Sequence, residues 1–180
     1  MSILNYSTDV MRMGYVLREG ETEVPQGFRN AYEQALKVRD VIRVNFKAGK
    51  TAAETLKILG NAIENAGFGF ILEDPTMDGG FSGVKMGDHI KYPDKTEVAI
   101  DFHALGGEIP LGPSITNFRR DRAQLTVHPN GFFSFEFMAY TAVPEWGGKK
   151  VRIGYEENAI ITERGVEWLY PPADKILLIK

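Results

Sequence analysis

The sequence has no cysteine, no excess of basic residues and no long apolar run, and each absence excludes a class of protein. Without cysteine in its 180 residues, the chain has no disulfide, no thiolate nucleophile and no cysteine-ligated metal. A net charge of −3 argues against nucleic acid or an anionic membrane surface as a partner. No apolar run reaches the ~18 residues that a membrane-spanning helix needs. The N-terminus lacks the basic and apolar regions of a signal peptide, so a soluble, cytoplasmic protein is the default expectation.

What is present is the composition of an ordinary globular protein, 43% hydrophobic and 25% charged. A chain of this length can bury a core, so residues 1–180 are expected to form a single domain. Apolar residues at a spacing of three to four run from Phe28 to Ile42 and predict a helix that begins near Pro25. A second helix is predicted after the T-x-x-E capping box of Thr51 and Glu54. Its expected buried face consists of Ala52, Leu56, Leu59, Ile63 and Ala66, and its expected end is Gly67.

Segments with an alternating apolar pattern predict strands. Residues 11–20 are expected to form a short strand that runs into a glycine turn. After the helices, strands are predicted in "EVAIDFHAL", "QLTVH", "FFSFEFMAYTA", "KKVRIGYEENAII" and "VEWLY", separated by the turn sequences "PNG", "VPEWGG" and "TERG". The Gly-, Pro- and Asp-rich residues 73–95 predict a long surface loop. Helices followed by antiparallel strands indicate the α+β class.

The stretch "FFSFEFMAY" places one carboxylate, Glu136, among aromatic residues. Residues two apart in a strand share a face, so Glu136 is expected on the face opposite the phenylalanines. A hairpin centred on Trp146 would place Glu156 directly across from Glu136. Facing like charges are destabilising unless a cation lies between them or one carboxylate stays protonated. The alternative is that Glu136 faces solvent from an edge strand and Glu156 is exposed; a one-residue slip in register would separate the pair.

Two further residues complete a candidate metal site. His103 follows the apolar strand "EVAIDF" and precedes a Gly-rich turn, a place where ligands are commonly displayed. Asp9 is expected on the early strand "STDVMRM". One imidazole with carboxylates from Asp9, Glu136 and Glu156 would suit Mn, Co, Fe or Zn. The alternative for a lone histidine is a structural residue whose hydrogen bonds are satisfied.

The segments that contain these residues resemble the pita-bread metallopeptidases, the family of Xaa-Pro aminopeptidases, prolidases, methionine aminopeptidases and creatinase. "STDVMRMGYVL" resembles the family's "SDxTR" strand, and "FKAGKTAAETL" resembles its "kpGxTaxE" helix start. "FHALGGEIPLGPSI" resembles "HxxG…GPxI", and "NGFFSFEF" resembles "NMVFTIEP". "VRIGYEENAIITERGVEWL" resembles "VRIEDTVLVTEDGVEVL". The matches occur in family order over nearly the whole chain. They imply the pita-bread fold, a curved antiparallel sheet with helices on its outer face.

The resemblance also implies a role for each candidate residue. Family members bind two metal ions through two Asp, one His and two Glu. By position, Asp9 resembles the second, bridging Asp and His103 the metal histidine. Glu136 resembles the first Glu, and Glu156 resembles the second Glu, which bridges the metals. Glu156 is preferred to Glu157 because it lies at the family's distance before "TERG". His103 and Glu136 are also the catalytic candidates.

The sequence departs from the family pattern in two places. The first Asp of the family would fall about eleven residues before Asp9, upstream of Met1, so the chain is expected to be a C-terminal portion of the domain without its N-terminal strands. The family's second histidine is also missing, because the corresponding segment reads "GGEIPLGP". These departures favour one metal ion in place of two. An uncovered sheet edge would in turn favour a homodimer.

Two functions follow from the resemblance. The first is a metal-dependent aminopeptidase of the Xaa-Pro aminopeptidase type, which hydrolyses N-terminal residues from peptides and here has reduced or no activity. The second is a catalytically silent homologue that keeps the fold for peptide binding or assembly, because a fold alone does not settle function. In the first, a divalent metal (Mn, Co, Zn or Fe) would be the cofactor and a peptide the substrate.

Overall fold

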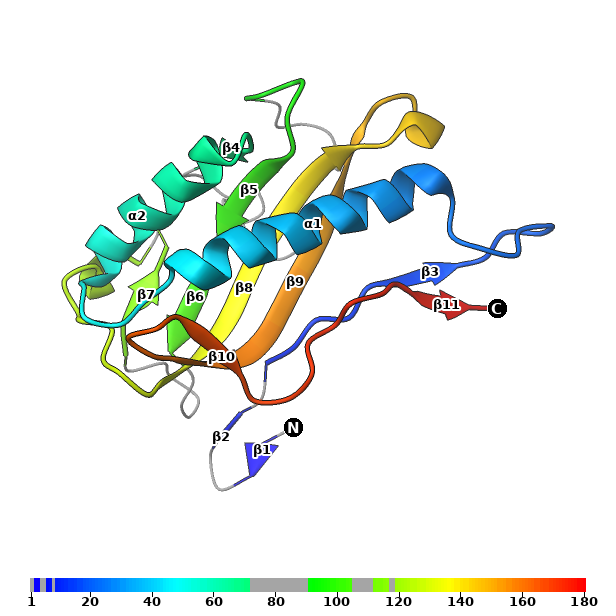
Figure 1. The fold of residues 1–180 in the computed structure, drawn as a ribbon. Helices are drawn as coiled ribbons and strands as arrows, with labels where there is room; N and C mark the ends of the chain where they lie inside the picture. The colour runs from blue at the N-terminus through cyan, green and yellow to red at the C-terminus, as the bar shows by residue number, and fades with distance from the viewer. Residues whose placement is uncertain (1, 4–5, 8, 72–90, 105–111, 117–118) are drawn as a thin grey trace.

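A seven-stranded sheet with two long helices across one face makes up most of the molecule (Figure 1). The structure is a computed structural model that describes residues 2–3, 6–7, 9–71, 91–104, 112–116 and 119–180. The helices are α1 (Gln26–Asn45) and α2 (Ala52–Asn65). The seven strands of the sheet are β4 (Gly69–Phe70), β5 (Glu97–Ile100), β6 (Phe102–Ala104), β7 (Ser114–Ile115), β8 (Gly131–Ala142), β9 (Lys150–Ile161) and β10 (Val166–Trp168). Two small ribbons pair β1 (Ser2–Ile3) with β2 (Tyr6–Ser7), and β3 (Gly14–Val16) with β11 (Leu177–Ile179).

Both predicted helices are present. Every residue of the expected stripe on α1 is buried: Phe28, Ala31, Tyr32, Ala35, Val38 and Ile42. Pro25 precedes α1 without a side-chain cap, and the carboxylate of Glu145 accepts a hydrogen bond from the amide of Gly27 at 2.7 Å instead. A Cβ at position 27 would collide with that carboxylate, so a larger residue there would have to displace the Glu145 side chain. The capping box of α2 is formed, and its end is marked by Gly67 at φ +91°.

The buried face of α2 is narrower than expected. Ala52, Leu59 and Ile63 are buried and Leu56 is half-buried, but the prediction for Ala66 is wrong because it is exposed. Ala66 is the C-cap residue, where the chain turns away from the helix axis. The apolar stripe therefore ends one turn earlier than the periodicity suggested.

The order of the sheet path is β10-β9-β8-β5-β4, with β6 and β7 attached beside β8. All of its pairs are antiparallel except one, because β4 runs parallel to β5. The expectation of a purely antiparallel sheet is therefore wrong at this edge. β4 follows α2 almost directly in the chain. It pairs with β5 at the edge of the sheet and runs in the same direction as β5.

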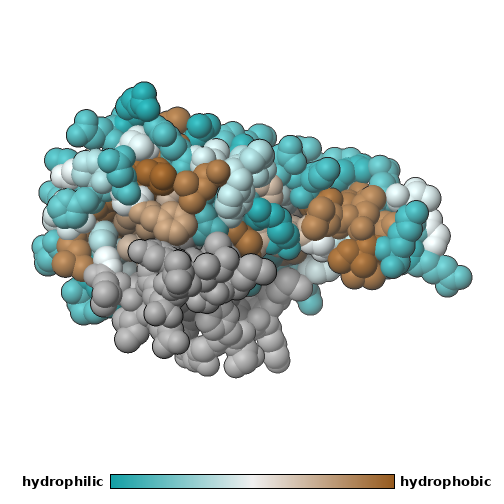
Figure 2. Space-filling model, turned by 90° about the horizontal axis from the view of Figure 1, so that it is seen from below, coloured by the Kyte–Doolittle hydropathy of each residue, from teal (hydrophilic) through white to brown (hydrophobic). Residues whose placement is uncertain are grey.

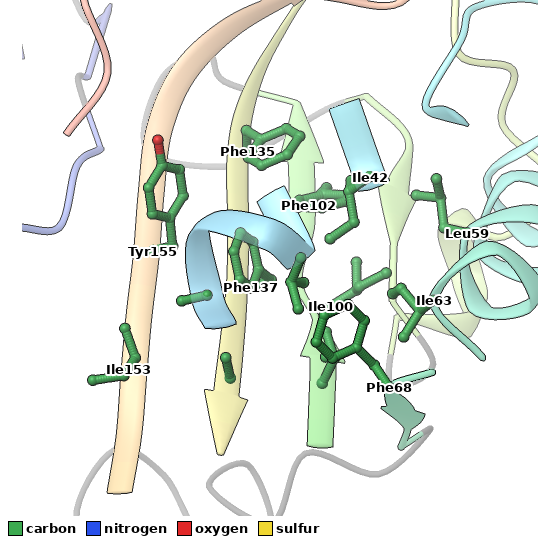
Figure 3. Close-up of a cluster of buried hydrophobic side chains, with 14 of the residues drawn as sticks. Ile42, Leu59, Ile63, Phe68, Ile100, Phe102, Phe135, Phe137, Ile153 and Tyr155 are labelled. Carbon is green, nitrogen blue, oxygen red and sulfur yellow. The ribbon is translucent and has the colours of Figure 1, made fainter. Parts of the chain in front are cut away.

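The β8–β9 hairpin has the predicted register, with Glu136 paired to Glu156. It turns through a short 3-10 helix, Pro144–Trp146, followed by Gly147 and Gly148 at positive φ. On the helix-facing side, the rings of Phe133, Phe135 and Phe137 are at most 2% exposed and form the core with α1 and α2 (Figure 3). Glu136 and Glu156 lie on the opposite face. The sequence pattern therefore assigned the two faces of the hairpin correctly.

The predicted strand "QLTVH" is not formed, and only an isolated bridge between Thr51 and Thr126 is present there. The backbone of this segment instead satisfies the start of α2. The carbonyl of Leu125 accepts from the amide of Ala52 at 2.9 Å, and the amide of Val127 donates to the carbonyl of Lys50 at 2.8 Å. Free amides at a helix N-terminus need such acceptors, so this tertiary contact overrides the alternating pattern.

Several shorter expectations are refined by the structure. The first predicted strand is confined to β3, and Gly20 forms the expected turn at φ +85°. The last predicted strand, "VEWLY", is regular only over β10. The predicted loop at residues 73–95 lies outside the described residues up to position 90. None of the described helices is long and apolar enough to cross a membrane.

Candidate metal centre

The four predicted ligands converge on the face of the sheet that is turned away from the helices. His103 lies on β6, Glu136 on β8 and Glu156 on β9, while Asp9 lies in the segment before β3. The Nε2 atom of His103 is 3.7 Å from Oε2 of Glu136 and 3.9 Å from Oδ2 of Asp9. One potential ligand atom each from Asp9, His103 and Glu156 lie within 4.8 Å of one another. Asp9, His103 and Glu156 therefore lie within reach of one ion, and Glu136 lies beside His103 but outside that closest group.

Strand register explains why His103 reaches the two glutamates. His103 pairs with Ser134 of β8, two residues before Glu136, so both side chains emerge on the same face. Ser134 is fully buried, and its hydroxyl donates to Oε1 of Glu156 at 2.6 Å. This hydrogen bond holds the carboxylate of Glu156 in place from the neighbouring strand.

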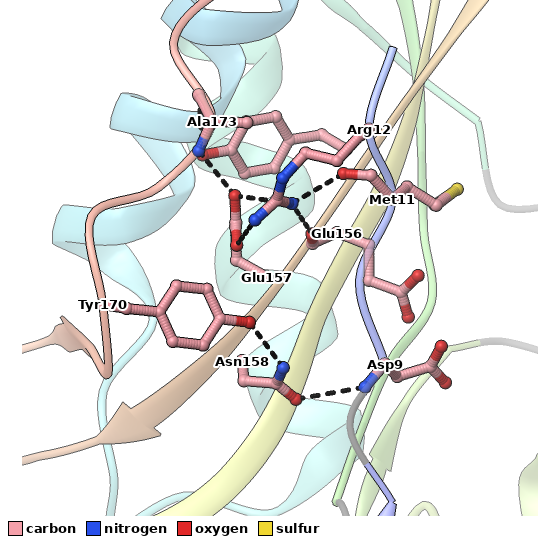
Figure 4. A network of polar contacts seen from close by, with 9 residues as sticks. Asp9, Met11, Arg12, Glu156, Glu157, Asn158, Tyr170 and Ala173 are labelled. Carbon is pink, nitrogen blue, oxygen red and sulfur yellow. Dashed lines mark hydrogen bonds and ion pairs between the residues drawn. The ribbon is translucent and has the colours of Figure 1, made fainter. Parts of the chain in front are cut away.

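Asp9 comes to the site without being in a strand, so that part of the prediction is wrong. Met11 forms an isolated bridge with Glu156 of β9, in which the Met11 amide donates to the Glu156 carbonyl at 3.2 Å. The amide of Asp9 itself donates to Oδ1 of Asn158 at 3.3 Å, and Nδ2 of Asn158 donates to the hydroxyl of Tyr170 at 2.6 Å (Figure 4). Asn158 and Tyr170 therefore position Asp9.

The choice of Glu156 over Glu157 agrees with the arrangement of β9. Glu157 points to the other side of the strand, away from Asp9 (Figure 4). Its carboxylate is 1% exposed, lies 3.1 Å from the guanidinium of Arg12 and accepts from the amide of Ala173 at 2.6 Å. Glu157 thus joins the N-terminal and C-terminal segments to the sheet, and Glu156 is the one available to a metal.

Two side chains at the site, Glu156 and His103, keep their protons to a higher pH than isolated side chains would, because their pKa values are raised. The pKa of Glu156 is raised to about 8, chiefly by burial and then by the neighbouring carboxylates of Glu136 and Asp9, while the hydrogen bond from Ser134 lowers it. Burial by itself lowers the pKa of His103. The hydrogen bond to Glu136 and the nearby carboxylates outweigh that effect, so the pKa of His103 is raised. Neighbouring carboxylates contribute to both shifts, and burial is the larger cause for Glu156.

This donor set fits a divalent cation. Oxygen ligands with one imidazole suit Mn²⁺ and related ions, and a cation would relieve the repulsion between facing carboxylates. Binding requires that Glu156 and His103 lose their protons, so metal affinity should increase with pH. The residues that could hold the ion are Asp9, His103, Glu136 and Glu156.

In the presence of a chelator, the free energy of unfolding should fall as the pH rises from 4.5 to about 8. The folded protein keeps a proton on Glu156 over this interval, whereas the unfolded chain has released it, so a higher pH favours unfolding. The measurement is urea denaturation at several pH values, and Glu156→Gln should reduce the slope because it cannot ionise. Glu163→Gln, an exposed site, serves as the control. Identical slopes for wild type and Glu156→Gln would contradict the assignment.

Sequence reasoning missed the residues that support the ligands. Ser134 lies two residues from Glu136, and Asn158 lies two residues from Glu156, so each shares a face of its strand with a candidate ligand. The alternation of the strands could therefore have indicated both residues. No sequence pattern indicated Tyr170, because its contact with Asn158 depends on the path of the chain after β10. Of the other two histidines in the sequence, His128 is exposed and His89 lies outside the described residues.

Comparisons with protein-family models and with curated proteins gave no match. Among solved structures, the X-Pro aminopeptidase from Thermotoga maritima MSB8 is 19% identical with a TM-score of 0.58, over 97% of this chain and 38% of that one. The prolidase from Pyrococcus horikoshii OT3 is 17% identical with a TM-score of 0.57, over 96% and 38%. The methionine aminopeptidase from Rickettsia prowazekii is 15% identical with a TM-score of 0.53, over 92% and 59%.

These likenesses show the fold. The chain has the architecture of part of a pita-bread domain, and the predicted α+β pita-bread fold is confirmed. The chain spans 38% of the length of the X-Pro aminopeptidase and of the prolidase.

Proposed function

We propose that this chain forms the metal-binding part of an aminopeptidase site of the Xaa-Pro aminopeptidase type, with Asp9, His103, Glu136 and Glu156 as ligands. The observation that carries the proposal is the convergence of these side chains from three strands and one separate segment, with His103 Nε2 within 4 Å of two carboxylates. Structural ion pairs seldom bring three carboxylates together around one imidazole, because their repulsion needs compensation. The likeness in fold to an X-Pro aminopeptidase and to prolidases supports the same class.

The chain's own residues suit hydrolysis of an amide bond. A divalent cation bound here would activate water and polarise the scissile carbonyl. Glu136 is half-buried beside His103, so its carboxylate can accept a proton from an attacking water and pass it on. His103 would serve as a ligand, because its Nε2 atom faces the carboxylates of Asp9 and Glu136. The buried hydrogen bond from Ser134 would keep the Glu156 carboxylate oriented during the reaction.

A second proposal is that the site binds metal and peptide without turnover. The chain spans only 38% of the X-Pro aminopeptidase of similar fold, and four of its residues match ligands that the family resemblance implies. A single ion can activate water but cannot contact both the nucleophile and the carbonyl as a two-metal site does. Metal binding is common to both proposals, and catalysis separates them.

Millimolar Mn²⁺ should raise the melting temperature of the wild-type protein. At a concentration 100 times Kd, ligation stabilises by about 2.7 kcal/mol, which corresponds to roughly 5–10 °C for a chain of this size. The measurement is a melting curve in chelator and in Mn²⁺, with Co²⁺ and Zn²⁺ as comparisons. Glu136→Gln and Glu156→Gln should lose most of the shift, whereas the exposed control Glu163→Gln should keep it. If metal leaves the wild-type midpoint unchanged, the four side chains do not form a metal site.

A further inference from the structure

Two serines flank His103 in the sheet. His103 of β6 is paired with Ser134 of β8 on one side and with Ser114 of β7 on the other. Directly paired residues of antiparallel strands carry their side chains on the same face, with Cβ atoms about 4.5–5.5 Å apart. The hydroxyl of Ser134 donates to Glu156, as described above. The hydroxyl of Ser114 lies on the other flank of the imidazole and is not bound to a carboxylate.

Two polar atoms of the His103–Ser114 pair have no hydrogen-bond partner among the residues that the structure describes. These atoms are Nδ1 of His103 and Oγ of Ser114, and both are buried. Ser114 is only 1% exposed, so bulk water does not reach its side chain. An unpartnered buried polar atom is destabilising, and two of them on neighbouring side chains therefore require an explanation.

The orientation of the imidazole determines what Nδ1 must do. Nε2 of His103 lies 3.7 Å from Glu136 and 3.9 Å from Asp9, so Nε2 is the nitrogen available to a metal ion. A histidine that binds a metal through Nε2 carries a proton on Nδ1 and donates it to an acceptor, which fixes the orientation of the ring. A serine hydroxyl can accept this bond, and rotation between its staggered χ1 positions changes where Oγ lies. Ser114 therefore offers an acceptor beside the nitrogen that needs one.

We propose that Ser114 is a positioning residue of the metal centre, and that its hydroxyl accepts a hydrogen bond from Nδ1 of His103 when Nε2 binds the ion. This role rests on the metal centre proposed above. The two flanking serines then act alike, because Ser134 orients Glu156 and Ser114 orients His103. The carbonyl of Ala104 is the competing acceptor, since it also acts on the imidazole. A hydroxyl can turn toward the ring, whereas this carbonyl is held by the strand and leaves Nδ1 unpartnered.

The test is a calorimetric titration with Mn²⁺ of wild type, Ser114→Ala and the control Thr116→Val. Thr116 is a matched control because it lies two residues further along, is 5% exposed and also has a buried hydroxyl without a described partner. Ser114→Ala should weaken Mn²⁺ binding about 10-fold or more, the usual loss when a histidine ligand loses its outer partner. Thr116→Val should keep the wild-type affinity. Ser114→Thr retains a hydroxyl and should recover most of the loss.

Melting curves in chelator separate positioning from a merely structural role. Ser114→Ala and Thr116→Val each remove an unpartnered buried hydroxyl, so neither should lower the melting temperature without metal. Both positions are near β6 and β7, at the other end of the molecule from the hydrophobic atoms exposed over β3 and β11 (Figure 1 and Figure 2). The variants therefore leave that exposed apolar surface unchanged. If Ser114→Ala lowered the melting temperature equally with and without metal, its role would be structural and the proposal would be wrong.

Nuclear magnetic resonance of the Zn²⁺-bound protein with ¹⁵N-labelled histidine reports the hydrogen bond itself. The ring of His103 should carry the metal on Nε2 and a proton on Nδ1, and the signal of that proton should move to lower frequency in Ser114→Ala. Since the chain has three histidines, the assignment is simple. The wild-type spectrum keeps the test decisive if Ser114→Ala does not fold, because a ring that binds metal through Nδ1 would overturn the proposal.

Two further results would overturn the proposal alone. Wild-type Mn²⁺ affinity in Ser114→Ala would leave the carbonyl of Ala104 as the partner of His103. Equal losses of affinity in Ser114→Ala and Thr116→Val would assign the effect to packing. A wild-type protein whose melting temperature does not respond to metal would overturn the proposal together with the metal centre, so the two failures are distinguishable.

Discussion

Replacing Lys150 with methionine is expected to lower the free energy of unfolding by about 3–5 kcal/mol. The ammonium group of Lys150 is 2.8 Å from Oε2 of Glu97, and the two side chains are 3% and 1% exposed. It also donates to the carbonyls of Tyr92 and Lys95 at 2.6 and 2.7 Å, so all three of its hydrogens are used. The variant would leave the Glu97 carboxylate buried and without its counter-ion.

Urea denaturation measures this effect, and the neighbouring lysine provides the control. Lys149 is exposed, so Lys149→Met should change the free energy of unfolding by less than about 0.5 kcal/mol. Glu97 also accepts from the amides of Lys91 and Tyr92 at 2.7 and 2.8 Å. The ion pair of Lys150 and Glu97 therefore binds the segment that contains Lys91 and Tyr92 to the sheet. The double variant Lys150→Met with Glu97→Gln should recover part of the loss because no buried charge remains. A loss below 1 kcal/mol for Lys150→Met would show that the pair is solvated.

The chain supplied with Mn²⁺ is expected to hydrolyse an Xaa-Pro dipeptide very slowly or not at all. The four proposed ligands are expected to hold one ion, and the segment that corresponds to the family's second histidine reads "GGEIPLGP". Loss of a single donor to the oxyanion costs about 10²–10³ in rate, and loss of a second metal adds to that.

The assay compares purified wild type with His103→Ala in Mn²⁺ and Co²⁺. Turnover of about one per second, within the ordinary range for enzymes, that disappears in His103→Ala would contradict this expectation and favour an active peptidase. Metal-dependent binding of the dipeptide without turnover would instead favour the silent homologue. The melting-temperature shift in Mn²⁺ distinguishes both from a chain that binds no metal.

The sequence predicted the two faces of the hairpin because strand alternation and turn position are local properties. The pairing of Glu136 with Glu156 followed from equal distances to Trp146, and the helix from Phe28 to Ile42 followed from its apolar period. Local rules failed where a segment's partner lay elsewhere in the chain. "QLTVH" alternates like a strand, but its backbone groups bind the start of α2.

By itself, the sequence determined the α+β class, both helices, the hairpin register and the identities of the candidate ligands. Only the tertiary structure decided that Asp9 reaches β9 through Asn158, that Glu157 is a buried partner of Arg12, and that Lys150 is buried with Glu97. Each of these contacts joins residues more than 50 positions apart. Their energies depend on burial and charge compensation, which a local pattern does not encode. The sequence could therefore nominate the site, whereas the packing of distant segments determined which carboxylates lie beside His103 and which are neutralised within the protein.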